Sequence, residues 1–258
     1  MDTDESSRAV KSVHTAFQIL STIQNRNRVT IQELSSEIGI ARSTAHNHLE
    51  TLRSMGYITK RSNSYQLGLR LLTHGMAARE TLPGKGKIIS TLEDVSEELS
   101  HPVWWIVEEQ GRGIFAARAG DGEVEERGYA KVGKRSYLHT HAPGKAILAK
   151  LSEESVQSIV DQHGLPILTK KTTTDPEKLS DELDEVREKG YAFCDGEVAL
   201  GIQSVGAAFT GPEERMYALG LFGYSHEFHG QRIDTDIATQ LHETAKHLEN
   251  SLRSAREP

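Results

Sequence analysis

The segment from Thr30 to Leu67 constrains the fold of this chain more strongly than any other. Thr30 and Glu33 form a capping box, in which each side chain satisfies a backbone N–H of the other, so a helix is predicted to begin there. Gly39 is typical of a residue that ends a helix. A second helix is predicted almost at once, since three apolar residues recur at helical spacing, at Ala45, Leu49 and Leu52. The pattern therefore predicts two short helices joined by a tight turn.

The outward face of the second predicted helix is polar and basic, as a reader of the DNA major groove requires. The residues expected to enter the groove are Arg42, Ser43, Thr44, His46 and Asn47. Two short alternating segments, 57–60 and 65–67, flank a polar turn and predict a β-hairpin. Lys60 and Arg61 lie near its tip, where they are expected to hold phosphates. Together these features predict a winged helix-turn-helix that binds double-stranded DNA.

The charge distribution favours this interpretation over the alternative, in which the helix pair is only a packing unit. Residues 1–79 contain ten Lys or Arg against six acidic residues, a net charge of +4. Because the whole chain carries −7, the remaining residues carry −11. Binding to phosphates needs a basic surface, and the basic excess lies in the segment that holds the predicted DNA-binding helices.

Length and composition predict a two-domain protein of a reducing cytoplasm. A chain of 258 residues can form two domains, each with its own core. No apolar run approaches the roughly 20 residues of a membrane span, so no membrane association is expected. The acidic and polar start, MDTDESSRAV, lacks the features of a secretory signal. Cys194 is the only cysteine, which excludes an intrachain disulfide.

Helical spacing also predicts a first helix over 10–24 and a connecting helix over 69–78. The inward stripe of the first helix is expected to be Val13, Phe17, Leu20 and Ile23. The first domain leaves little to cover the stripe of the connecting helix, which is expected to pack on a second subunit through Leu69, Leu72 and Met76. Pro83-Gly84 is a breaker pair. We therefore expect a DNA-binding domain at 8–68, a linker helix at 69–82 and a second domain at 83–254.

The second domain is predicted to mix strands and helices. Strand-like segments occur at 103–108, 113–118, 191–194, 203–209 and 216–223, and helical segments at 85–99, 142–151, 153–162, 176–189 and 234–252. Asp175-Pro176 is typical of a helix start and Gly190 of its end. Trp104 and Trp105 are adjacent on a predicted strand and should face opposite sides of the sheet. The mixed order predicts an α+β fold in which one antiparallel sheet is flanked by helices.

Five segments of the chain resemble the isocitrate-lyase-regulator (IclR-type) family of prokaryotic transcription factors. They are GIARSTAHNHLETLRSMGYI in the first domain and, in order in the second, Leu138–Ala149, Gly164–Leu179, Glu182–Glu197 and Gly201–Phe209. The resemblance implies a GAF-like effector domain, a palindromic operator and a homodimer that can pair into a dimer of dimers. It also implies a small-molecule effector from a catabolic pathway, such as a sugar, a sugar acid, a keto acid or an aromatic acid.

The resemblance further implies an effector site formed by Ala142, Pro143, Gly144, Cys194, Ile202, Ser204, Leu221 and Gly223. The small residues 142–144 begin a predicted helix, whose unpaired N–H groups suit an anionic group. In the alternative interpretation, Gly144 and Lys145 only permit close packing and cap the helix. Leu221 and Gly223 are expected to face the pocket together with Cys194 and Ser204. Relatives often carry other residues at positions 47, 194, 204, 221 and 223, so the operator sequence and the effector are expected to differ.

Two other functions remain as alternatives. Cys194 as a nucleophile would make the chain a GAF-like redox enzyme, but its sequence neighbours supply no base or cation. A purely architectural DNA-binding protein would bind no small molecule. Histidines at 139, 141, 226 and 229 are spaced for metal binding, yet the sequence has no Cys-x-x-Cys or His-Glu-x-x-His motif. We therefore expect a regulator rather than an enzyme, with no metal and no cofactor.

Overall fold

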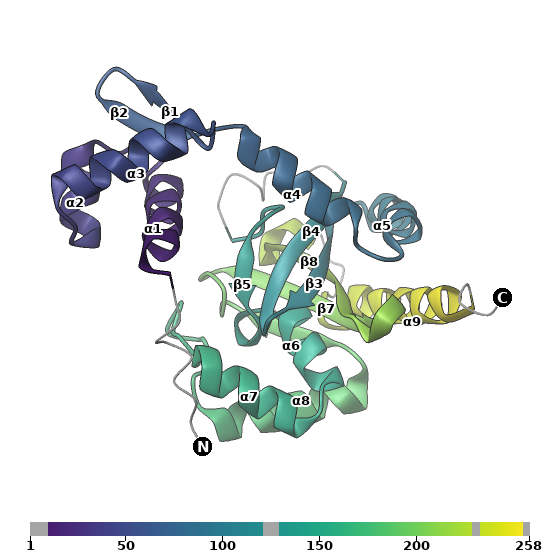
Figure 1. The fold of residues 1–258 in the computed structure, drawn as a ribbon. Helices are drawn as coiled ribbons and strands as arrows, with labels where there is room; N and C mark the ends of the chain where they lie inside the picture. Colours follow the sequence, from purple (N-terminus) through teal and green to yellow (C-terminus); the bar gives the residue numbers. More distant parts are fainter. Residues whose placement is uncertain (1–9, 121–128, 229–232, 255–258) are drawn as a thin grey trace. The chain divides into compact units, whose positions relative to one another are not determined.

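The computed structural model describes residues 10–120, 129–228 and 233–254 of the 258-residue chain (Figure 1). The chain divides into two compact units, Met1–Thr81 and Leu82–Pro258, and each has its own hydrophobic core. The α+β architecture predicted from the sequence is confirmed. Within the described ranges, no helix has the length and apolar character needed to cross a bilayer.

The first unit is a winged helix-turn-helix followed by a further helix. Its elements are α1 (Lys11–Arg26), α2 (Ile31–Ile38), α3 (Arg42–Ser54), β1 (Ile58–Arg61), β2 (Ser64–Leu67) and α4 (Arg70–Glu80). The capping box predicted for α2 is confirmed. The Glu33 N–H donates to the Thr30 hydroxyl oxygen at 3.3 Å, and the Thr30 N–H donates to the Glu33 carboxylate at 2.7 Å. Gly39 ends α2 with a φ of 68°, a left-handed conformation that suits glycine.

The core of the first unit joins the helices to the hairpin. Its buried residues are Ile19, Ile23, Val29, Leu34, Ala45, Leu49, Leu52, Ile58 and Tyr65. The predicted inward stripe of α1 is partly wrong, because Val13 and Phe17 are 53% and 65% exposed. Ile23 of the predicted stripe is buried, as expected, and Ile19 is buried beside it. Apolar spacing identified α1 as amphipathic but did not distinguish the face that meets this core from a second apolar face.

The second unit is built around one antiparallel sheet with the strand order β5-β4-β3-β8-β7-β6. The strands are β3 (Val103–Glu109), β4 (Arg112–Ala119), β5 (Arg135–Tyr137), β6 (Ala192–Asp195), β7 (Ile202–Thr210) and β8 (Met216–Tyr224). β7 and β8 pair along their full lengths, from Ile202 opposite Tyr224 to Thr210 opposite Met216. The shorter β6 pairs only with residues 203–206 of β7. The outer edge of β7 therefore extends beyond its neighbour.

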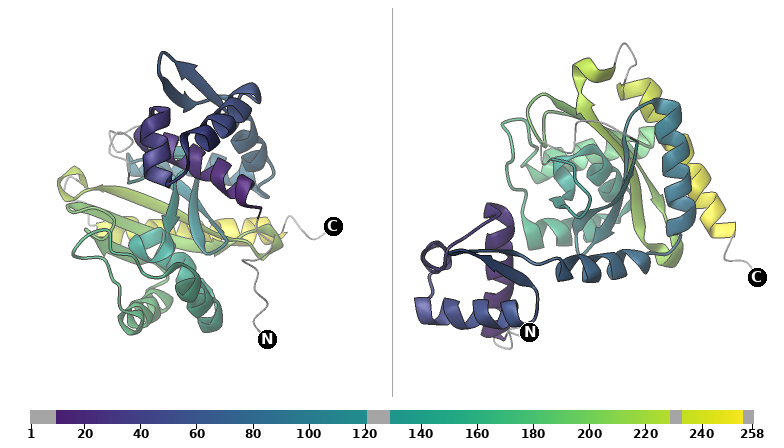
Figure 2. Two further views of the ribbon diagram at one scale, coloured as in Figure 1. Left: turned by 60° about the vertical axis from the view of Figure 1, so that its left-hand side comes forward. Right: turned by 90° about the horizontal axis from the view of Figure 1, so that it is seen from above.

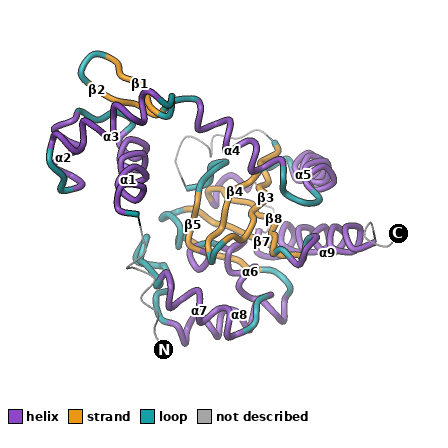
Figure 3. Tube along the Cα trace, in the orientation of Figure 1, coloured by secondary structure: helices purple, strands orange, loops and turns teal. Residues whose placement is uncertain are grey.

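Helices cover both faces of this sheet, as the tube in Figure 3 shows. One face packs on α5 (Lys85–Leu99) and α9 (Ala238–Ser254), which lie side by side (Figure 2). The other face packs on α6 (Ala142–Lys150), α7 (Glu153–His163) and α8 (Pro176–Lys189). Short helical turns at Leu138–Thr140, Pro212–Glu214, Ser225–Phe228 and Ile233–Ile237 complete the described elements.

The paired tryptophans confirm the predicted alternation of β3. Trp104 packs on the face covered by α6 and α8, where its ring lies edge-on to Phe222 at 5.5 Å. Trp105 packs on the opposite face, edge-on to Tyr217 at 5.2 Å. Both side chains are fully buried. The edge strand β5 was not predicted, because three residues are too few to show an alternating pattern.

Candidate functional sites

The helix α3 presents a continuous polar surface. Arg42, Ser43, Thr44, His46 and Asn47 are all exposed, whereas Ala45, Leu49 and Leu52 on the opposite side are buried in the core. Only residues 39–41 separate α3 from α2, so the two helices form the tight pair that a helix-turn-helix requires. The structure therefore brings the five predicted groove residues together on one face of one helix.

The hairpin β1–β2 is anchored to the core and carries its cations outward. Val29 and Tyr65 exchange backbone hydrogen bonds of 3.2 and 2.8 Å, which tie β2 to the segment before α2. Lys60 and Arg61 are exposed, and the Lys60 ammonium lies 5.4 Å from the centre of the Tyr65 ring. A firmly held hairpin with exposed cations is suited to contact a phosphate backbone beside the groove.

In the second unit, the first turn of α6 is buried and its backbone donors are already used. Ala142 N–H donates to the Ser204 hydroxyl oxygen at 3.2 Å, and Gly144 N–H donates to His141 Nδ1 at 3.0 Å. Lys145 N–H donates to the carbonyl of His141 at 3.0 Å. The expectation that this helix start presents unpaired N–H groups is therefore wrong.

The small residues at this helix start are explained by close packing. A β-carbon on Gly144 would lie 2.1 Å from the carbonyl oxygen of Leu138. Pro143 is equally confined, since β-carbons on Gly206 and Gly220 of the sheet would lie 2.4 and 2.2 Å from its atoms. This geometry matches the packing interpretation of the segment.

His141 is a neutral, oriented side chain within this core. Because Nδ1 accepts from Gly144, the ring proton is on Nε2, which donates to Ser136 Oγ at 2.7 Å. The Ser136 hydroxyl in turn donates to the carbonyl of Gly113 at 3.1 Å. Burial lowers the pKa of His141 to about 3, and the nearby Lys134, His139 and Lys145 lower it in the same direction.

The effector residues expected from the sequence divide between the two faces of the sheet. Cys194 pairs with Ser204, and Ser204 pairs with Phe222, so these three side chains share the face covered by α6. Ile202 lies on the same face, two residues before Ser204. The expectation for Leu221 and Gly223 is wrong, because Leu221 pairs with Val205 and packs toward α5 and α9, and Gly223, two residues on, faces the same way. Phe222 takes the place expected for them.

A buried lysine holds together three segments beside this face. Lys145 Nζ lies 2.7 Å from the carboxylates of both Glu182 on α8 and Glu197 after β6, and its side chain is 3% exposed. Thr173 adds a hydroxyl donor to Glu182 at 2.8 Å and its N–H to Glu197 at 3.3 Å. Burial alone would lower the pKa of Lys145, but Cys194, Glu197 and Glu182 raise it overall above its usual value.

Cys194 is not placed for nucleophilic chemistry. The side chain is buried, and burial raises the pKa of its thiol well above the ordinary value, with Glu197 acting in the same direction and Lys145 opposing. A thiol that stays protonated at neutral pH is a weak nucleophile. Cys194 is therefore unsuited to be the reactive group that the interpretation as a redox enzyme requires.

Two of the four histidines predicted to be spaced for metal binding have other hydrogen-bond partners. His139 Nε2 lies 3.2 Å from the carbonyl of Pro166, and His141 is engaged by Ser136 and Gly144. His229 lies outside the described residues. Across the part of the chain that the structure describes, no group of three His, Cys, Asp or Glu side chains is arranged to hold a metal ion.

Comparison with known proteins matches both units to described families. Residues 87–250 match the model of the bacterial transcriptional regulator IclR C-terminal domain, and residues 14–59 match a winged helix-turn-helix DNA-binding model. The HTH-type transcriptional regulator KipR of Bacillus subtilis is 26% identical over 225 residues, which are 86% of this chain and 90% of KipR.

Solved structures share the fold along almost the whole chain. An IclR transcriptional regulator from Alicyclobacillus acidocaldarius superposes with a TM-score of 0.76 at 25% identity, covering 94% of this chain and 98% of that one. An IclR homologue from Microbacterium hydrocarbonoxydans, solved in complex with 4-hydroxybenzoate, superposes with a TM-score of 0.71 at 20% identity. That alignment covers 94% of this chain and 99% of the homologue.

Proposed function

Because this chain belongs to the IclR family of DNA-binding transcriptional regulators, we propose that it controls the genes of a catabolic pathway in response to a small metabolite. Members of this family are regulators and not enzymes, in keeping with the buried, protonated Cys194. The observation that carries the proposal is the exposed polar face of α3 beside the basic hairpin. We assign that face to the major groove of a palindromic operator.

Within this proposal, the two sets of contacts have different roles. Arg42, Ser43, Thr44, His46 and Asn47 lie on one helical face and reach base edges, whereas Lys60 and Arg61 hold phosphates. Asparagine can pair with adenine through two hydrogen bonds, so Asn47 is the best candidate for direct base readout. The lysine contributes through charge and carries no sequence information.

Replacement of Asn47 with alanine is expected to weaken operator binding by about 1–3 kcal/mol and to relax discrimination at one base position. The operator is first selected from random duplexes, and affinity is then measured by fluorescence anisotropy on the operator and on a random duplex. Lys60→Ala is the contrasting variant. It should weaken binding to both duplexes alike, and it should reduce by about one the slope of log affinity against log salt concentration. Equal affinities of Asn47→Ala and the wild-type protein on both duplexes would contradict the placement of α3.

An exposed apolar surface on the first unit supports a dimer. Leu69, Leu72 and Met76 along α4 are 85%, 61% and 42% exposed, and no residue of α4 is buried. A groove of about 630 Å³ lies in the same unit and is lined by residues of α1, α3 and α4, including Val13, Phe17 and Met55. The groove meets α4 through Leu71 and His74, which lie on another side of that helix, so the stripe of Leu69, Leu72 and Met76 is a separate apolar surface that we assign to an interface. We propose that a second copy of this chain covers it, so that two winged helices bind one palindrome.

Replacement of Leu72 with aspartate is expected to yield a species of lower mass by light scattering, because a charge would be buried in the proposed interface. Operator affinity should fall toward that of one half-site. Thr73→Asp is the matched control, since it adds the same charge at the next exposed position of α4. An unchanged mass for Leu72→Asp would remove α4 from the interface.

We propose an effector site on the sheet face covered by α6, lined by Ile202, Ser204 and Cys194, with the residues 142–144 bounding it through close packing and not through hydrogen-bond donation. The aromatic residues Trp104, Phe115 and Phe222 pack in the same cluster, which favours an effector with an apolar or aromatic body. The relative that binds 4-hydroxybenzoate supports an aromatic acid, beside sugars, sugar acids and keto acids. Effector binding would change the spacing of the two winged helices and thereby their fit to the operator.

A further inference from the structure

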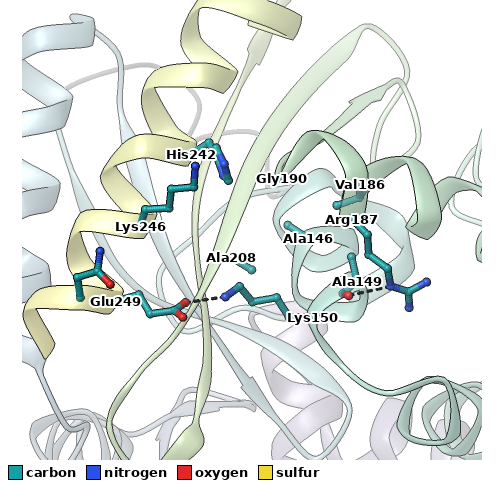
Figure 4. Close-up of a pocket in the computed structure, with 11 residues that line it drawn as sticks. Ala146, Ala149, Lys150, Val186, Arg187, Gly190, Ala208, His242, Lys246 and Glu249 are labelled. Carbon is teal, nitrogen blue, oxygen red and sulfur yellow. Dashed lines mark hydrogen bonds and ion pairs between the residues drawn. The ribbon is translucent and has the colours of Figure 1, made fainter. Parts of the chain in front are cut away.

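The second unit contains a further pocket of about 340 Å³, at the edge of the sheet and separate from the effector site proposed above. Residues from α6, α8, β7 and α9 line it, among them Ala146, Lys150, Arg187, Ala208, His242 and Lys246 (Figure 4). We propose that this pocket binds a small metabolite through a carboxylate or phosphate group. The proposal does not depend on the identity of the effector or of the operator.

The floor of the pocket is an open stretch of sheet edge. β6 begins at Ala192, opposite Gly206, so the part of β7 from there to Thr210 has no partner strand on this side among the described strands. The Thr210 N–H points away from the sheet, because it donates to Glu249 Oε2 at 2.8 Å. Backbone N–H groups alternate in direction along a regular strand, so the N–H of Ala208 points the same way, into the pocket. A ligand on this floor would therefore meet a main-chain donor between small side chains.

The walls of the pocket carry an excess of positive charge. Lys150, Arg187 and Lys246 come from three different helices, and Glu249 is the one acidic side chain in the lining. Glu249 is already engaged, with Lys150 Nζ at 2.6 Å, the Thr210 N–H at 2.8 Å and an Arg253 nitrogen at 3.4 Å. The lining residues thus carry a net charge of +2 with His242 neutral, and the carboxylates that pair with Arg187 and Lys246, on Asp184 and Glu243, lie outside the lining. An anionic ligand is favoured because it competes only with these exposed pairs.

Lys246 is the cation most easily recruited by a ligand. Its recorded ion pair, with Glu243 at 3.2 Å, joins side chains that are 57% and 64% exposed, and such pairs contribute little. Figure 4 shows the Lys246 ammonium group beside the His242 ring, whereas the Lys150 ammonium group is directed toward Glu249. An anion beside Lys246 and His242 would gain a charge-assisted contact from Lys246 while Lys150 stays paired with Glu249.

The titration of His242 can report anion binding in this pocket. Burial and the charges of Lys246 and Lys150 lower the pKa of His242, while Glu243 and a hydrogen bond to the backbone of Gly190 oppose that shift. A bound anion would offset the two lysine charges and raise the pKa of His242. Binding is then accompanied by proton uptake, so affinity should increase as the pH falls toward the free-state pKa.

The test uses the full chain labelled at histidine Cε1 and followed by NMR, with His242→Gln to assign the signal. Sodium sulfate represents a tetrahedral dianion and sodium succinate a dicarboxylate, and both are titrated at constant ionic strength. We expect the His242 signal to shift and saturate with at least one of them, and its pKa to rise in the complex. Saturation by sulfate alone assigns a phosphate-bearing ligand, and saturation by succinate alone assigns a carboxylate.

Lys246→Ala should lower the affinity for whichever anion saturates the signal about tenfold, as expected for loss of one charge-assisted contact. Lys189→Ala is the matched control: it removes the same charge from a similar exposed helical pair, with Glu185 at 2.9 Å, outside the pocket lining. The affinity of the Lys189→Ala protein for the same anion should stay within about twofold of the wild-type value. Linear, non-saturating shifts with both anions, or equal losses in the two variants, would overturn the proposal.

Discussion

Replacement of Lys145 with methionine is expected to destabilise the second unit by about 3–5 kcal/mol. Glu182 and Glu197 would lose the ammonium group that lies 2.7 Å from each of them. Thr173, which donates to both carboxylates, does not replace a positive charge. Methionine preserves most of the side-chain volume, so the loss reports chiefly on the uncompensated carboxylates and little on a cavity.

Urea unfolding of the purified variant measures this loss. Lys171→Met is the matched control, because Lys171 pairs with Asp195 at 2.6 Å while both side chains are nearly half exposed. That variant should stay within about 0.5 kcal/mol of the wild-type stability. Glu197→Met combined with Lys145→Met should recover part of the loss, since one of the two unpaired carboxylates is then removed. A loss below about 1 kcal/mol for Lys145→Met alone would show that the network is not stabilising.

Replacement of Gly144 with alanine should lower the free energy of unfolding by about 3 kcal/mol or more, which is at the upper end of the effects of overpacking. The added methyl group would lie 2.1 Å from the carbonyl oxygen of Leu138, which is backbone and cannot rotate away. The start of α6 would have to move from the sheet, with loss of the hydrogen bond from Ala142 to Ser204. Thermal and urea unfolding measure the effect.

Gly86→Ala is the matched control for this variant. Gly86 lies in α5 of the same unit, and a β-carbon there meets no atom within 4 Å. Alanine should therefore stabilise this helix by about 0.5–1 kcal/mol. A Gly144→Ala protein as stable as the wild type would mean that Leu138 and α6 separate at little cost.

Local signals predicted local structure well. The capping box of Thr30 and Glu33, the terminating Gly39 and the Asp175 cap of α8 are all present as predicted. Each depends on residues within a few positions of one another, where backbone chemistry leaves few alternatives. The same holds for the polar face of α3, because its buried side is defined by Ala45, Leu49 and Leu52 alone.

Contacts between residues far apart in the sequence could not be predicted from local patterns. Lys145 meets carboxylates 37 and 52 positions away, and no sequence spacing indicates that contact. Leu221 was assigned to the wrong face because strand alternation makes an error of one residue exchange the two sides of a sheet. The exposure of Phe17 has a similar origin, since spacing shows that a face is apolar without showing what covers it.

The hydrogen-bond chain through His141 has a mechanical consequence for the sheet edge. Every donor in it points one way, from Gly144 through the imidazole and Ser136 to Gly113, so no member can reverse without leaving a buried polar atom unsatisfied. Ser136 lies in β5, which has only three residues and forms the outermost strand. A strand of that length would ordinarily fray first. Here, peeling β5 from the sheet also removes the acceptor of the buried His141 ring that caps α6, so opening of the edge is energetically coupled to the start of that helix.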